Sequence, residues 1–203
     1  MAIAAPPFTN PASILLWNFL KFLDGIYGMY SDSCAGIDLF AQNIKALPAP
    51  PDKAIFFLHG DDPNSSDATY THAVKIGDLI SRNAHDGPNQ LLLSRSCIVF
   101  IYSIWETVRP LYAEAISRVQ NDIVSDVFGD LRNYRNAIAH NNSVLGKKPI
   151  ILPFVKMGEP VELKRAQMDE LFVILFNEVD QISVKFTGDA LKLPFARILN
   201  PGL

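Results

Sequence analysis

The sequence contains only two cysteines among its 203 residues, Cys34 and Cys97, and they lie far apart. Two cysteines exclude a framework of several disulfides, and their spacing matches no set of metal ligands. A strong basic excess is also missing, because the formal net charge is −3, whereas proteins that wrap duplex DNA are usually strongly basic. The chain lacks the Gly-rich loop of nucleotide triphosphatases and the Gly-x-Ser-x-Gly elbow of α/β-hydrolases. We therefore expect neither a metal ion nor a bound cofactor.

Long uninterrupted apolar runs are absent as well. The first apolar stretch is broken by Lys21 and Asp24, and the second by Glu106 and Arg109, so neither reaches the roughly 18 apolar residues of a membrane-spanning helix. The first residues include two prolines and no basic side chain, unlike a secretory leader. These observations predict a soluble, cytoplasmic protein with no membrane partner.

Hydrophobic residues make up 49% of the chain and charged residues 19%, which is typical of a globular protein. Apolar residues recur with helical periodicity in most of it. The expected helices cover residues 13–45, 73–82, 91–119, about 121–140 and 168–182. We predict an all-α bundle with one small β-hairpin, formed by residues 150–155 and 160–163, before the C-terminal helix. Residues 1–11 are expected to form a flexible tail, and 12–203 a single domain with an inserted loop region at about 46–72.

The helix that ends near His140 is predicted to have one polar face. On an ideal helix this face lies opposite an apolar arc that includes Leu131 and Tyr134. The polar face carries Arg132, Arg135, Asn136 and His140. Arginine binds phosphate through fixed, forked donors, and histidine exchanges a proton near neutral pH. This combination of side chains is typical of a site that handles phosphate.

A basic segment surrounds this face, since no acidic residue occurs between positions 131 and 158. We expect Arg132, Lys147 and Lys148 to bind substrate phosphates. The alternative is that the same charges meet an acidic partner protein. Glu106, on the preceding apolar helix, either orients the arginines of the polar face or pairs with Arg109 one helical turn away.

Residues 135–140, Arg-Asn-Ala-Ile-Ala-His, resemble the R-x4-6-H signature of the HEPN superfamily, including the polar residue after the arginine. The preceding apolar helix with its embedded Glu106 resembles the family context too, so that the resemblance covers roughly residues 91–183. It implies a helical bundle, often a homodimer, that cleaves RNA without a metal in a cleft shared by two protomers. Arg135, Asn136 and His140 would then be the catalytic residues. The resemblance also implies a role as a toxin or in anti-phage defence, with an antitoxin or another protein as a possible partner.

One geometric problem accompanies this interpretation. Arg135 and His140 are separated by about 140° on an ideal helix, so they do not converge within one chain. Either the helix unwinds near Ala139, or each residue serves a different protomer. Two other functions remain open: a non-catalytic HEPN protein that binds RNA, a nucleotide or a partner protein through this face, and an all-α interaction domain.

Overall fold

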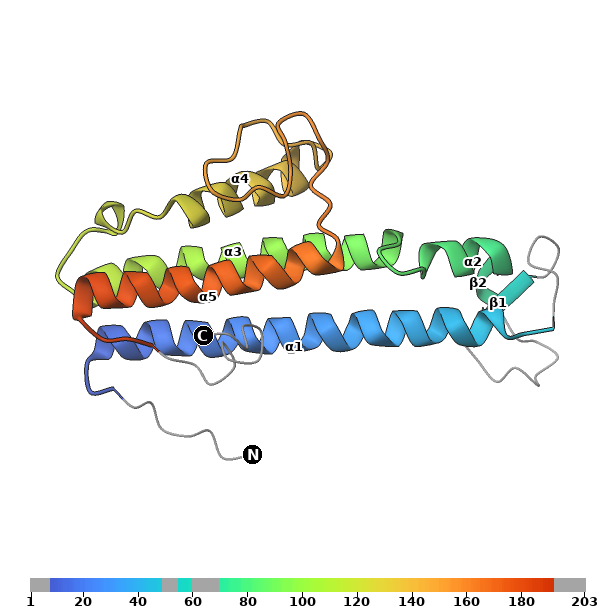
Figure 1. Ribbon diagram of the computed structural model, residues 1–203, viewed down its shortest axis with the longest axis horizontal. Helices are drawn as coiled ribbons and strands as arrows, with labels where there is room; N and C mark the ends of the chain where they lie inside the picture. The colour runs from blue at the N-terminus through green and yellow to red at the C-terminus, as the bar shows by residue number, and fades with distance from the viewer. Residues whose placement is uncertain (1–7, 49–54, 60–69, 192–203) are drawn as a thin grey trace. The chain divides into compact units, whose positions relative to one another are not determined.

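The computed structural model describes residues 8–48, 55–59 and 70–191, and within these ranges the fold is all-α, as predicted (Figure 1). Its helices are α1 (Pro11–Lys45), α2 (Ile76–Arg82), α3 (Pro88–Ala115), α4 (Asp126–His140) and α5 (Arg165–Thr187). The chain divides into two compact units. The larger unit comprises Met1–Tyr30 and Leu93–Leu203, and the smaller one Ser31–Leu92. All the predicted site residues belong to the larger unit.

Aromatic side chains join three helices in the core of the larger unit. Trp105 of α3 stacks on Phe128 of α4, with ring centroids 3.9 Å apart and an angle of 9° between the planes. Phe19 of α1 lies 5.5 Å from the Trp105 ring and 6.1 Å from the Phe128 ring. All three side chains are buried. Tyr102, one helical turn before Trp105 on α3, is buried as well.

Helix α5 completes this bundle. Figure 1 shows α3 and α5 running alongside the N-terminal part of α1, with α4 on their other side. Tyr27 of α1 packs on Phe172 of α5 at 4.9 Å between ring centroids, and its hydroxyl donates a hydrogen bond to Asp169. The hydroxyl of Tyr112 on α3 donates to the carbonyl oxygen of Ile182 at 3.4 Å. The predicted apolar stripe of this helix is buried as expected.

The smaller unit contains a short antiparallel pair of strands, β1 (Ile55–His59) and β2 (Tyr70–Lys75). Helix α2 follows β2 directly and starts at Ile76, three residues later than predicted. Ile76 and Leu79 pack against Ile44 at the end of α1. Most of the predicted inserted loop (residues 49–54 and 60–69) and residues 1–7 of the predicted tail lie outside the described ranges.

Helix α3 is long and apolar enough to cross a membrane by length and composition, with a mean hydropathy of 1.4 over its best 18-residue window. From sequence we had expected the charges of Glu106 and Arg109 to leave this apolar stretch too short to span a membrane. The central helix of a soluble bundle passes the same test, so the finding is weak evidence for a membrane span. In the structure α3 buries Ile98, Ile101 and Trp105 in the core of the larger unit.

The predicted hairpin before α5 is wrong. Residues 141–164, the α4–α5 loop, are all described and form no strand, only an isolated bridge between Val144 and Pro160. The reason is that a side chain takes the backbone donors that a hairpin would need. The amides of residues 150–152 donate to the carboxylate of Asp130 at 2.7–2.9 Å.

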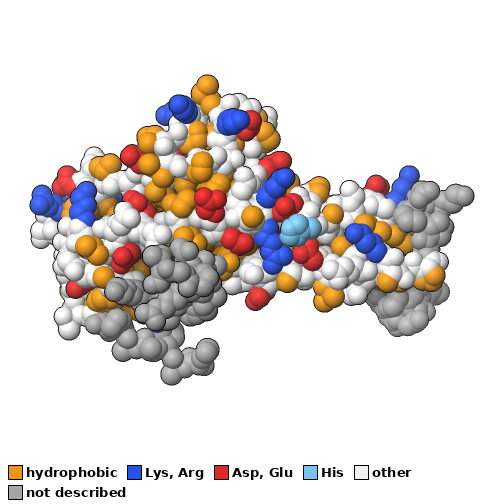
Figure 2. Space-filling view, in the orientation of Figure 1, with side chains coloured by type: hydrophobic (Ala, Val, Ile, Leu, Met, Phe, Trp, Pro, Cys, Tyr) orange, Lys and Arg blue, Asp and Glu red, His pale blue; other side chains and the backbone are white. Residues whose placement is uncertain are grey.

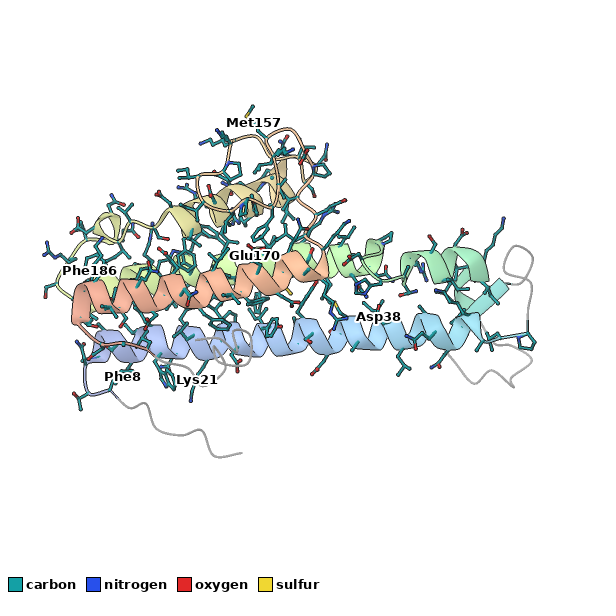
Figure 3. All side chains as sticks on the ribbon, viewed as in Figure 1. Phe8, Lys21, Asp38, Met157, Glu170 and Phe186 are labelled. Atoms are coloured by element: carbon teal, nitrogen blue, oxygen red, sulfur yellow. The ribbon has the colours of Figure 1, made fainter. Side chains whose placement is uncertain are left out.

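Asp130 thus anchors the α4–α5 loop to α4. Its side chain is only 1% exposed. The buried hydroxyl of Tyr134, one turn further along α4, donates to the carbonyl oxygen of Leu152 at 3.1 Å. Burial raises the pKa of Tyr134 to about 12. Met157 marks the outer end of the loop (Figure 3).

Candidate functional site

Helix α4 carries the signature residues and is regular along its whole length. Its first turn is capped by the Ser125 hydroxyl, which accepts a hydrogen bond from the amide of Phe128 at 3.1 Å. The helix continues to His140 and closes with a bond from the Asn141 amide to the Ala137 carbonyl oxygen. It does not unwind near Ala139, so Arg135 and His140 point in directions about 140° apart.

Arg135 is held by two neighbours. One terminal nitrogen of its guanidinium donates to the Asn136 side-chain oxygen at 3.0 Å, and the other lies 3.9 Å from the Glu106 carboxylate. The predicted contact between Glu106 and an arginine of α4 is therefore confirmed. However, the Glu106 side chain is 45% exposed, so burial of its charge is not the reason for the contact. An exposed pair contributes at most about 1 kcal/mol, and its main effect is to orient Arg135.

Tyr102 lies one helical turn before Glu106 and borders the same charges. Burial raises the pKa of Tyr102 above its ordinary value, and the carboxylate of Glu106 raises it further. The guanidiniums of Arg132, Arg109 and Arg135 act in the opposite direction. The Tyr102 phenol is therefore neutral near pH 7 and able to donate a hydrogen bond beside three arginines. We missed this role from sequence, although Tyr102, Glu106 and Arg109 share the helical spacing i, i+4, i+7.

The structure thus brings together Glu106 and Arg109 of α3 with Arg132, Arg135 and Asn136 of α4, a group that we call the arginine cluster. The cluster contains three guanidiniums and one carboxylate, all close enough to affect the pKa of Tyr102, so its net positive charge attracts anions. The Nε atoms of Arg109 and Arg135 are buried without a hydrogen-bond partner in the described part of the chain. Their terminal nitrogens remain the groups through which these arginines can bind a phosphate.

The other predicted site residues are not part of the arginine cluster. His140 is exposed at the end of α4 and makes no hydrogen bond or ion pair with any described residue. Lys147 and Lys148 are exposed on the α4–α5 loop. Figure 2 shows basic and hydrophobic side chains at the outer surface of this region, where Ile150 is 70% exposed. Lys147 shares a small hollow with Asn136, which links the loop to the polar face of α4.

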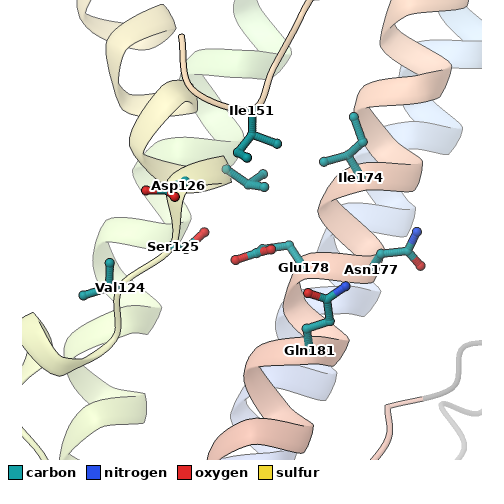
Figure 4. Close-up of a pocket in the computed structure, with 9 residues that line it drawn as sticks. Val124, Ser125, Asp126, Ile151, Ile174, Asn177, Glu178 and Gln181 are labelled. Carbon is teal, nitrogen blue, oxygen red and sulfur yellow. The ribbon is translucent and has the colours of Figure 1, made fainter.

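A larger hollow of about 490 Å³ lies between the start of α4 and α5 (Figure 4). Its charged lining residues are Asp126 and Glu178, and no cation lines it. A phosphate would be repelled there. The hollow is also separate from the signature residues, so it is not a candidate for phosphate chemistry.

Two further features concern metal ions and the specificity of the motif. Among the described residues, no group of three or more His, Cys, Asp or Glu side chains could hold a metal ion.

A second segment, Arg82 to His85, also has an arginine and an asparagine followed by a histidine, but its asparagine has a structural role. Asn83 is buried, and its side chain donates to the Leu79 carbonyl oxygen at 2.8 Å.

Comparisons with known proteins gave no match to a family model, to a curated protein or to a solved structure.

Proposed function

We propose that this protein is a HEPN-type endoribonuclease that works as a homodimer and cleaves RNA without a metal ion. The observation that carries the proposal is the arrangement of α4. Its polar face offers an oriented arginine, Arg135, and an exposed histidine, His140, which has no hydrogen-bond or ion-pair partner among the described residues. The helix stays regular between the two. In a dimer, Arg135 of one copy can meet His140 of the other, which the two residues of one copy cannot do.

The chemistry follows from the side chains. The ribose 2′-hydroxyl attacks the adjacent phosphorus and loses its proton to a base, while the 5′-oxygen of the next nucleotide leaves and receives a proton from an acid. His140 serves as one of these two groups, since an imidazole exchanges protons near neutral pH. Arg135 and Arg132 stabilise the charge on the phosphorane oxygens. The products are a 2′,3′-cyclic phosphate and a 5′-hydroxyl.

The remaining residues position the RNA. Asn136 fixes the Arg135 guanidinium, and Glu106 limits its movement from the other side. Arg109, within the arginine cluster, and Tyr102, beside it, add further donors. Lys147 and Lys148 provide charge for flanking phosphates on the α4–α5 loop.

The test compares wild type with His140→Ala and Arg135→Ala on mixed single-stranded and structured RNA. His140 is exposed, so we expect His140→Ala to leave the melting temperature unchanged and to lower cleavage by about 10²–10⁴-fold. The Arg135 side chain is 29% exposed and its Nε is buried, so we expect Arg135→Ala to lose cleavage with a small decrease in melting temperature. Cleavage by wild type is expected to survive EDTA and to leave cyclic phosphate ends. Full activity of His140→Ala would refute the assignment, and inhibition by EDTA would refute the mechanism.

A non-catalytic HEPN protein is the second candidate. The observation that favours it is that Arg135 is held by Asn136 and Glu106 within one chain, while His140 points about 140° away from it. One chain can therefore bind an anion at Arg135 without bringing an acid–base group to it. Tight RNA binding by wild type without any cleavage products would support this alternative.

A further inference from the structure

The hollow that joins α4 to the α4–α5 loop has a volume of about 180 Å³ and an unusual concentration of amides. It is well below the roughly 300–1,000 Å³ of pockets for drug-sized ligands, and suits one planar ring. Its lining includes Asn133 and Asn136 of α4 with Asn141, Val144, Gly146 and Lys147 of the loop. We call it the amide pocket. Lys147 is its only charged lining residue, so an anionic ligand is favoured over a cationic one.

Several polar atoms of the amide pocket have no partner among the described residues. The side-chain nitrogen of Asn141 donates to the Val144 carbonyl oxygen at 2.6 Å, and the oxygen of Asn136 accepts from Arg135. These two bonds leave the nitrogen of Asn136, the oxygen of Asn141 and the whole amide of Asn133 available. Together they offer both donors and acceptors, which is what the edge of a nucleobase requires.

The loop wall of the amide pocket is held by backbone hydrogen bonds. Asn142 and Ser143 adopt left-handed conformations, with φ of 47° and 65°. The Ser143 amide donates a hydrogen bond to the Ala137 carbonyl oxygen at 2.9 Å. The Leu145 amide donates one to the Glu159 carbonyl oxygen at 2.9 Å. A wall fixed in this way is formed before the ligand arrives, which reduces the ordering cost of binding.

The pocket also lies on the side of α4 that carries His140. On an ideal helix His140 falls at an angle between those of Asn136 and Asn133, and about 6 Å along the axis from Asn136. A ligand in the amide pocket is therefore close to the imidazole, whereas Arg135 points to another side.

We propose that the amide pocket binds one unpaired nucleobase of the RNA strand, next to the phosphate at His140. The inference rests on the proposed function, because it takes RNA as the ligand. Sequence-specific recognition of RNA usually targets unpaired bases through hydrogen bonds to their edges. The amides read the base, Val144 packs against its ring, and Lys147 binds the phosphate beside it. The pocket thereby gives the site a base preference.

The experiment measures binding, so that it does not depend on cleavage. Four homopolymeric single-stranded RNAs are titrated by fluorescence anisotropy into His140→Ala protein and into the same protein with Asn133→Ala. The Asn133 side chain makes no hydrogen bond with any described residue, so its replacement is not expected to affect folding. The matched control is Asn177→Ala, an asparagine on α5 that lines the other hollow (Figure 4).

We expect the His140→Ala protein to bind one of the four RNAs more tightly than the others. Adding Asn133→Ala is expected to lower the affinity for that RNA by about fivefold or more and to make the four affinities similar. Asn177→Ala is expected to leave the preference unchanged. Equal affinities in the parent protein, or an unchanged preference in Asn133→Ala, would overturn the proposal even if wild type cleaves RNA. If the base preference depends on Asn133 but wild type never cleaves RNA, the proposal that the pocket binds a base is kept and only the proposed nuclease activity is rejected.

Discussion

At the scale of single residues, the position of Arg135 between an amide and a carboxylate decides how it can meet an anion. Asn136 occupies one terminal nitrogen, and Glu106 lies 3.9 Å from the other. Because Glu106 is 45% exposed, water competes for the pair and the contact is weak. A phosphate that approaches the arginine cluster can therefore displace Glu106 at small cost.

Replacing Glu106 tests this competition. We expect Glu106→Gln to tighten RNA binding by up to about fivefold, since an exposed ion pair is worth at most about 1 kcal/mol. The melting temperature is expected to change little. The matched control is Glu114→Gln, an exposed glutamate of the same helix that changes the net charge equally. Anisotropy titrations at two salt concentrations measure the effect, and an identical gain in both variants would show that only overall charge matters.

At the scale of elements, the α4–α5 loop owes its shape to α4. Three backbone amides converge on the Asp130 carboxylate, and the Tyr134 hydroxyl binds a carbonyl oxygen of the same segment. Hydrogen bonds to a charged acceptor contribute about 1.5–3 kcal/mol each. The anchoring fixes a loop that also supplies one wall of the amide pocket.

We expect Asp130→Asn to destabilise the protein by about 2–4 kcal/mol, because the uncharged amide accepts fewer bonds and turns a donor toward other donors. Hydrogen exchange at Ile150, Ile151 and Leu152 is expected to accelerate strongly. The control is Asp126→Asn at the exposed start of α4. There the negative charge stabilises the helix N-terminus by only about 0.3–1 kcal/mol. Equal stability and equal exchange in the two variants would contradict the anchoring role.

At the scale of the whole molecule, the regularity of α4 separates two models of the site. If Arg135 of one protomer acts with His140 of the other, the active protein is a dimer. If the two residues act within one chain, helix geometry keeps them about 140° apart. The first model requires symmetric association, and most homodimers have two-fold symmetry.

Mixed dimers decide between the models. Arg135→Ala and His140→Ala chains with different affinity tags are co-expressed, and the heterodimer is isolated. In a shared site one of the two half-sites keeps both wild-type residues, so we expect about half of the wild-type activity per dimer, while each homodimer is silent. Light scattering checks the mass of each species. A silent heterodimer, or a wild type that is strictly monomeric and active, would exclude the shared site.

Much of the helical layout could be predicted from local patterns. The limits of α1 and the end of α4 at His140 follow from helical periodicity, which depends on residues within a few positions of each other. The polar face of α4 was predictable for the same reason. The start of α4 at Asp126 lies about five residues later than predicted. The hairpin prediction failed because β-prone residues at 150–155 met a carboxylate that lies 20 positions away in the chain.

The sequence by itself determined which residues share the polar face of α4, since a helix repeats every 3.6 residues whatever surrounds it. Only the tertiary structure decided that Glu106 contacts Arg135, that Tyr102 borders the arginines, and that Asn133 shares a hollow with Lys147. These relations join α4 to α3 or to the α4–α5 loop. They depend on how elements pack against each other, and packing is set by the buried faces of all the helices together rather than by any local pattern.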